Sequence, residues 1–155
     1  MITERERGLR LADDAAKQIN KRFGVRCAEH IKPEAYAAAY GVRVVESKLD
    51  GAHARLGTGP YPIISDRPCH PGERNFSIAH ELGHHVLRHP PSRVDALCKQ
   101  APYRPVRHGT ARHPEAEANT LAAGVCMPSE LLTATIRTAT PSLDVARAIA
   151  TEYRM

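Results

Sequence analysis

Several residue types and segments are scarce or missing in this sequence of 155 residues. It contains no Trp and only two Phe, so its core must be built mainly from Ala, Leu, Val and Ile. Residues 1–7 lack the apolar run of a signal peptide, and no apolar stretch approaches the roughly 20 residues that span a bilayer. These absences predict a cytoplasmic protein that does not enter a membrane.

Cysteine pairs and a concentrated charge are also missing. The net charge of +5 is spread along the chain without a nucleic-acid-binding signature, so no direct contact with nucleic acid is expected. An acidic protein partner fits this charge at least as well. The four cysteines are far apart in the sequence and include no Cys-x-x-Cys pair. Reduced, partly buried thiols are therefore predicted for Cys27, Cys69, Cys98 and Cys126.

The N-terminal part carries helix signals at both ends of two segments. Thr3 and Glu6 form a capping box at the start of a helix that should end at Gly24. A second, short helix should begin at Pro33, a favoured first helical position, and end at Gly41. We interpret both helices as scaffold.

The rest of the chain combines strand and helix patterns. Three segments alternate or are rich in β-branched residues, namely residues 41–46, 52–56 and 61–65. They should form a small antiparallel sheet. Helical patterns follow at residues 73–87, 114–127, 129–138 and 141–153. Residues 90–114 form a basic, proline-rich loop, and long loops are often functional. The chain is thus predicted to be a single α+β domain, residues 1–155, with about five to six helices packed with the sheet.

The most informative stretch is His80-Glu81-x-x-His84, which lies inside a predicted helix. Residues four apart on an α-helix are about 40° apart around its axis, so both imidazoles can bind one metal ion. Glu81 lies beside them, within reach of a water on that metal rather than of the metal itself. Because two histidines leave a zinc ion incompletely coordinated, the motif predicts a third ligand elsewhere in the chain.

The helix predicted over residues 114–127 offers that ligand. Glu115 would complete a His-His-Glu set and leave the fourth position for water, as catalytic zinc requires. Asn119, one turn later on the same face, can accept a hydrogen bond from a ligand histidine. Glu117 is the alternative ligand, but it points about 200° away from Glu115 and has no such partner. The sequence therefore favours Glu115, for zinc or another divalent ion such as manganese.

Two further histidines follow the motif. Around the helix axis, His85 lies about 100° and His89 about 140° from His84, so neither shares the metal-binding face. The histidine-bearing extension of metzincins is excluded, because Leu87 and Pro90 occupy the positions of its Gly and His. We interpret His85 and His89 as surface or partner-facing residues.

Two segments, taken in order, resemble one known family. Residues 75–87 contain Phe-Ser-Ile-Ala-His-Glu-Leu-Gly-His, and residues 115–128 read Glu-Ala-Glu-Ala-Asn-Thr-Leu-Ala-Ala-Gly-Val-Cys-Met-Pro. Together they resemble the ImmA/IrrE family of metallopeptidases, and the resemblance covers roughly residues 30–150. Leu121 and Cys126 stand where the family pattern has Phe and Leu.

This resemblance implies a compact, gluzincin-like (zincin-like) fold and a cytosolic protease that cleaves helix-turn-helix transcriptional repressors. It also implies that His80, His84 and Glu115 bind one Zn²⁺ and that Glu81 is the general base toward a metal-activated water. The predicted function is therefore a zinc endopeptidase that regulates transcription. The alternative is a non-catalytic, zinc-bound module that displaces a repressor without cleaving it. Glu81, which metal binding does not need, favours catalysis.

The predicted reaction also needs a hydrogen-bond donor for the tetrahedral oxyanion beside the metal. Tyr103, His108 and His113 lie in the basic loop and have suitable side chains, although none has a diagnostic spacing. The sequence favours Tyr103 or His108 and does not decide between them.

Overall fold

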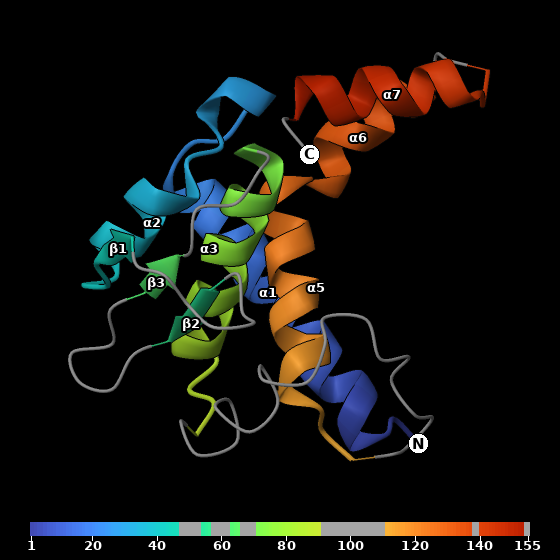
Figure 1. Ribbon diagram of the computed structural model, residues 1–155. Coiled ribbons are helices and arrows are strands. Elements are labelled where there is room, and N and C mark those ends of the chain that lie inside the picture. Colours follow the sequence, from blue (N-terminus) through green and yellow to red (C-terminus); the bar gives the residue numbers. More distant parts are fainter. Residues whose placement is uncertain (47–53, 57–62, 66–70, 91–110, 138–139, 154–155) are drawn as a thin grey trace.

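The computed structural model describes residues 1–46, 54–56, 63–65, 71–90, 111–137 and 140–153 (Figure 1). Helices dominate this part of the chain. They are α1 (Glu4–Arg22), the 3₁₀ helix η1 (Ala28–His30), α2 (Pro33–Ala39), α3 (Pro71–Val86), α5 (Pro114–Cys126), α6 (Ser129–Ile136) and α7 (Leu143–Glu152). Three short strands form one sheet, namely β1 (Val44–Glu46), β2 (Ala54–Leu56) and β3 (Ile63–Ser65). This arrangement is compatible with a zincin-like α+β fold.

The elements pack in layers around α5 and α3 (Figure 1). Helix α5 lies between α1 and α3, whereas α3 also contacts β2 and β3, and α2 packs on α3 and β1. The core is built from small and aliphatic side chains with one buried Tyr, as the composition predicts. Its buried members are Ala12, Ala16, Ile19, Tyr36, Ala37, Val42, Ile78, Ala79, Leu82, Leu121, Ala122, Val125 and Cys126.

The described cysteines are both free thiols. Cys126 belongs to the core, and burial raises the pKa of its thiol to about 12, so it stays protonated at neutral pH. Cys27 is exposed. Cys69 and Cys98 lie outside the described residues.

The sheet differs from the predicted antiparallel one. Its strand order is β1-β3-β2. Strand β3 pairs antiparallel with β2 but parallel with β1, where Val44 lies opposite Ile63. The prediction is therefore wrong for the β1–β3 pair. The chain goes from β1 to the far edge of the sheet and returns through the middle, and an alternating sequence pattern predicts strands without fixing their order.

The capping signals of the N-terminal helices are confirmed. Thr3 is the N-cap of α1, and its side chain and that of Glu6 form the reciprocal bonds of a capping box. Gly24 and Gly41, which follow α1 and α2, have φ angles of 62° and 75°. Because this left-handed conformation favours glycine, both helices end where the sequence predicts.

Helices α3 and α5 approach closely at Gly83. A Cβ atom built on Gly83 would lie 3.2 Å from the Cα atom of Ala118 and 3.3 Å from its carbonyl oxygen. These neighbours are backbone atoms, which cannot rotate away as the end of a side chain can. A larger residue at position 83 must therefore move the two helices apart.

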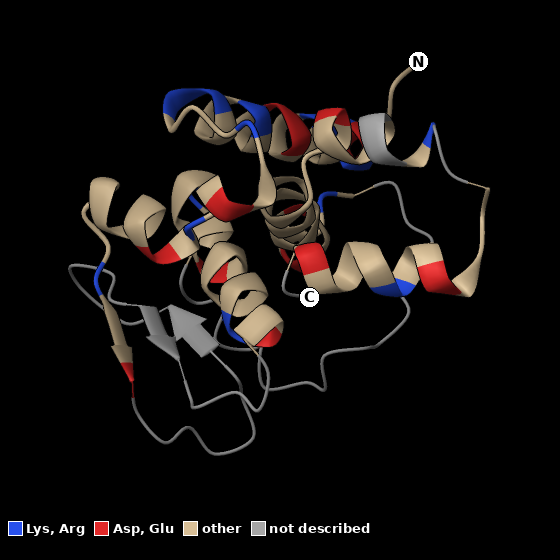
Figure 2. Ribbon diagram, turned by 90° about the horizontal axis from the view of Figure 1, so that it is seen from above, with Lys and Arg blue, Asp and Glu red and all other residues tan. Residues whose placement is uncertain are grey.

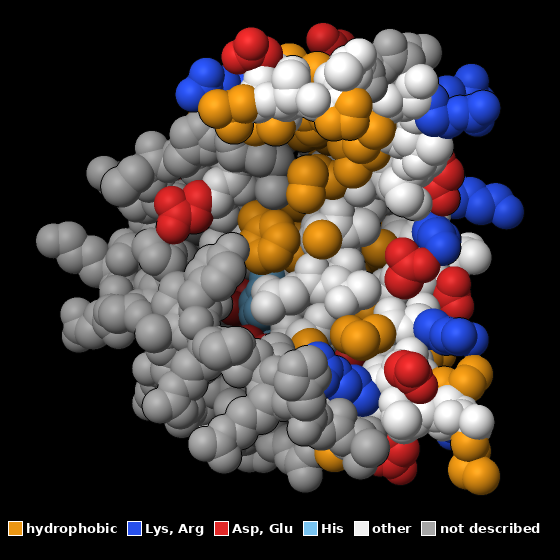
Figure 3. All heavy atoms as spheres, turned by 90° about the vertical axis from the view of Figure 1, so that its right-hand side faces the viewer, with side chains coloured by type: hydrophobic (Ala, Val, Ile, Leu, Met, Phe, Trp, Pro, Cys, Tyr) orange, Lys and Arg blue, Asp and Glu red, His pale blue; other side chains and the backbone are white. Residues whose placement is uncertain are grey.

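The C-terminal helices α6 and α7 lie at the end of α5 that is away from the sheet (Figure 1). Helix α7 has no buried residue, and Ile136 and Leu143 are 49% and 67% exposed. Hydrophobic side chains gather on and below these helices on the face seen in Figure 3.

No described helix is both long and apolar enough to cross a membrane. Figure 2 shows Lys and Arg next to Asp and Glu along α1, so this helix does not present a purely basic surface.

Gly83→Val should lower the free energy of unfolding by about 1–3 kcal/mol, because overpacking this contact forces the backbones of α3 and α5 to shift. Urea denaturation of the metal-free protein measures the loss. Ala146→Val, at an exposed position of α7, controls for a β-branched residue in a helix and should cost less than about 1 kcal/mol. Equal stability of the two variants would contradict the close packing at Gly83.

Candidate metal centre

The His-Glu-x-x-His motif lies on α3 at its contact with α5. The Nε2 atoms of His80 and His84 are 3.0 Å apart, so the two imidazoles face the same point. His84 is fully buried and Glu81 is 1% exposed. The helical spacing therefore has the consequence expected from the sequence, and the site lies largely inside the protein.

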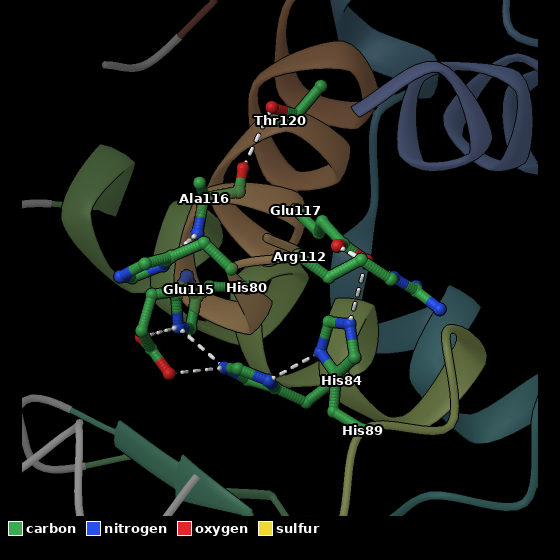
Figure 4. Close-up of polar contacts among 9 residues, drawn as sticks. His80, His84, His89, Arg112, Glu115, Ala116, Glu117 and Thr120 are labelled. Atoms are coloured by element: carbon green, nitrogen blue, oxygen red, sulfur yellow. Dashed lines mark hydrogen bonds and ion pairs between the residues drawn. The ribbon is translucent and has the colours of Figure 1, made fainter. Parts of the chain in front are cut away.

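Glu115, in the first turn of α5, reaches both histidines (Figure 4). Its Oε2 lies 3.2 Å from His80 Nε2, and its Oε1 lies 3.3 Å from His84 Nε2. Two ligand atoms of a tetrahedral zinc, each about 2.0–2.1 Å from the metal, are about 3.3 Å apart, so this donor triangle fits a zinc ion. Within the described part of the chain, these three residues form a group that could hold a metal ion.

The charges of this group shift one another's pKa values. Burial lowers the pKa of His80, but the hydrogen bond with Glu115 and the nearby charge of Glu81 raise it above its usual value. For His84 burial dominates, and its pKa is lowered. Burial raises the pKa of Glu115, but its hydrogen bonds with the two histidines lower it well below the usual range. An ionised carboxylate next to a neutral His84 suits metal binding, which requires deprotonated ligands.

Asn119 lies one turn after Glu115 on α5 and contacts the outer side of His80. Its Oδ1 is 2.9 Å from His80 Nδ1. A proton on Nδ1 would donate to this oxygen and leave the lone pair of Nε2 directed toward Glu115 and His84. The structure thus brings Asn119 to the position in which it can orient a histidine ligand.

Glu117, the alternative ligand, points away from this group and is buried in another polar cluster (Figure 4). Its Oε1 accepts a hydrogen bond of 3.0 Å from Arg112 Nε, and its Oε2 accepts one from Arg112 Nη2. The same Oε2 lies 3.2 Å from His89 Nε2. Burial raises the pKa of Glu117, but the bonds from Arg112 and His89 lower it below its usual value. Both carboxylates of this helix turn are therefore ionised, in separate surroundings.

The interpretation of His89 as a surface residue is wrong. It is 7% exposed, and its Nδ1 lies 2.9 Å from His84 Nδ1. Helix α3 ends in a Schellman motif, in which Arg88 has a φ of 55° and the His89 N–H donates to the His84 carbonyl oxygen at 2.9 Å. This turn folds His89 back onto His84. The sequence signal is Pro90, since proline often follows such a helix end.

The predicted oxyanion donors are not all within the described residues. Tyr103 and His108 lie outside them. His113 is the N-cap of α5, where its Nδ1 accepts a hydrogen bond of 3.3 Å from the Ala116 N–H. This imidazole therefore helps to begin the helix that carries Glu115.

Glu115→Gln should weaken zinc binding by more than about 100-fold, because it removes a charged donor from the metal group, whereas loss of a group behind a ligand typically costs about 10–100-fold. Glu117→Gln is the isosteric control and should weaken binding less. Competition with a chromophoric chelator measures both dissociation constants. A larger effect at Glu117 would overturn the assignment of Glu115.

Zinc should stabilise the folded protein, since a ligand that binds the native state alone adds about 2.7 kcal/mol at a free concentration about 100-fold above its Kd. Thermal unfolding should therefore occur at a higher temperature with zinc than with a chelator. Magnesium, which prefers oxygen ligands, serves as the control ion and should have little effect. An unfolding temperature that zinc does not change would contradict a preformed metal centre.

Residues 37–155 match the family model of peptidase M78, described as the IrrE N-terminal-like domain. A search of curated proteins finds no match. The matched range contains α3 and α5 and thus every residue of the candidate metal centre. The chain therefore belongs to the peptidase M78 family of metallopeptidases, in agreement with its resemblance to the ImmA/IrrE proteins.

Proposed function

We propose that this protein is a zinc-dependent endopeptidase that cleaves a helix-turn-helix transcriptional repressor in the cytoplasm. Its membership of a metallopeptidase family supports the reaction class. The observation that carries the metal dependence is the donor triangle of His80, His84 and Glu115, with separations of 3.0–3.3 Å. We assign these three residues as the metal ligands.

The metal and the protein supply different parts of the chemistry. When bound, zinc would act as a Lewis acid that polarises the scissile carbonyl and lowers the pKa of a water molecule. The chain would hold that metal with one carboxylate and two imidazoles, and Asn119, whose Oδ1 lies 2.9 Å from His80 Nδ1, would orient the imidazole of His80. Protein groups then have to move the protons of the reaction.

Glu81 is suited to this proton transfer. It neighbours His80 on α3, is 1% exposed, and its charge contributes to the raised pKa of that histidine. It is not among the residues that form the possible metal-binding group in the described part of the chain. We assign it to take a proton from the attacking water and to deliver it to the leaving amine.

The substrate class follows from the resemblance of residues 75–87 and 115–128 to the ImmA/IrrE family. We infer that the repressor is a substrate because the family that the chain resembles acts on such proteins, and that residues 1–155 form one metallopeptidase domain. Tyr103 or His108 remains our prediction for the oxyanion donor, since both lie in the sequence between the two helices that carry the metal-binding residues and have side chains that can donate a hydrogen bond.

Glu81→Gln tests this function directly. The variant should bind zinc as the wild type does but cleave the repressor at least about 100-fold more slowly, because it lacks the general base. Cleavage of a helix-turn-helix repressor encoded next to this gene is followed by mass spectrometry, with zinc, with manganese and with a chelator. Glu130→Gln, at an exposed position of α6, is the matched control and should retain full activity.

Two results would contradict the proposal. Inactivation of the repressor by zinc-loaded Glu81→Gln at the wild-type rate would identify a binding module that displaces its partner without cleaving it. Cleavage that persists after complete removal of the metal would contradict the assignment of the metal centre.

A further inference from the structure

His84 uses both nitrogens of its imidazole. Its Nε2 faces His80 and Glu115, and its Nδ1 lies 2.9 Å from His89 Nδ1. We propose that His89, held from behind by Glu117 and Arg112, is a positioning residue that fixes the tautomer and ring orientation of His84. This inference rests on the proposed metal centre, in which His84 is a ligand.

The contacts allow one arrangement of protons when a metal is bound. A coordinating Nε2 carries no proton, so the proton of neutral His84 is on Nδ1 and donates to His89 Nδ1. Because His89 accepts through Nδ1, its own proton is on Nε2, 3.2 Å from Glu117 Oε2. The carboxylate accepts that proton as a hydrogen bond. If His89 Nδ1 instead donated to His84 Nδ1, the proton of neutral His84 would be on Nε2 and would prevent metal binding.

Charge and burial fix the position of Glu117, the last acceptor in this series of hydrogen bonds. Glu117 is 1% exposed and accepts hydrogen bonds from both Nε and Nη2 of Arg112, which holds its carboxylate in one orientation. Gly8 of α1 covers this carboxylate, since a Cβ atom at that position would collide with the Glu117 side chain. The acceptor of His89 therefore cannot rotate away.

A purely stabilising role explains this cluster less well. The Glu117 carboxylate is buried although the Arg112 side chain is 48% exposed, and burying a charge costs free energy that an apolar residue at this position would not cost, so stability alone does not require a charged Glu117. His80 is oriented by a neutral amide, that of Asn119, whereas His84 is oriented by an imidazole that a carboxylate polarises. Such a carboxylate–histidine chain behind a metal ligand orients the ligand and makes it more basic.

The first experiment compares zinc affinities of the full chain by chelator competition. His89→Leu introduces an apolar side chain of similar size that cannot accept a hydrogen bond from His84. The zinc Kd of this variant should rise about 10–100-fold. His89→Asn offers an oxygen near the position of Nδ1 and should bind zinc several-fold more tightly than His89→Leu. His30→Leu, which removes an exposed histidine of η1, should bind zinc as the wild type does.

The second experiment reads the tautomers without any substitution. In ¹H–¹⁵N spectra of the zinc-loaded wild type, His84 should carry its proton on Nδ1 and His89 on Nε2. A proton on Nδ1 of His89 would overturn the proposal even if His89→Leu failed to fold. Cobalt-loaded His89→Leu should also show a shifted visible absorption spectrum, whereas cobalt-loaded His30→Leu should not.

The outcomes separate this inference from the function on which it rests. Wild-type zinc affinity and an unchanged cobalt spectrum in His89→Leu would refute the role of His89 and leave the metal centre intact. Absence of zinc binding by the wild type would refute the metal centre itself and this role with it. Loss of zinc affinity in His89→Leu with partial rescue by His89→Asn supports the positioning role.

Discussion

The close contact of α3 with α5 at Gly83 is the constraint on which the candidate site depends. The three donors of the metal group come from these two helices, so their separation is set by how near the helices can approach. Gly83 precedes His84, and Ala118 precedes Asn119, so the atoms at closest approach are direct neighbours of residues in the site. The packing of the core and the geometry of the metal centre are therefore set by the same contact.

The parts of the fold that were predictable from the sequence depend on local geometry. A capping box at Thr3, prolines at first helical positions and glycines at helix ends act within one or two turns, and their helices begin and end where expected. The convergence of His80, His84 and Glu115 was predictable for a related reason. Helical spacing places His80 and His84 on one face of α3, and Glu115 and Asn119 on one face of α5. A single contact between these two helices is then enough to bring the metal group together.

The parts that were missed depend on tertiary arrangement. The order of the three strands follows from a crossing that an alternating pattern does not encode. The prediction that His89 lies at the surface is wrong because the helical angle on which it depends applies only within α3, and the left-handed Arg88 ends the helix before His89. Glu117 pairs with Arg112, which lies just before α5. This pairing depends on the conformation of the backbone before the helix, which helical spacing does not fix.

The buried polar chain also shows why α1 belongs to the site although the family match begins at residue 37. A charged Glu117 in the interior is tolerated only if its charge is paired and both of its oxygens are hydrogen-bonded, because burial removes the hydration of the carboxylate. Arg112 and His89 supply the bonds, and α1 supplies the cover through Gly8. The Asn20 side-chain amide donates to the Gly124 carbonyl oxygen at 2.8 Å and holds α1 on α5. The support of His84 therefore extends from the turn that follows α3, through α5, to α1, which lies outside the residues that match the family model.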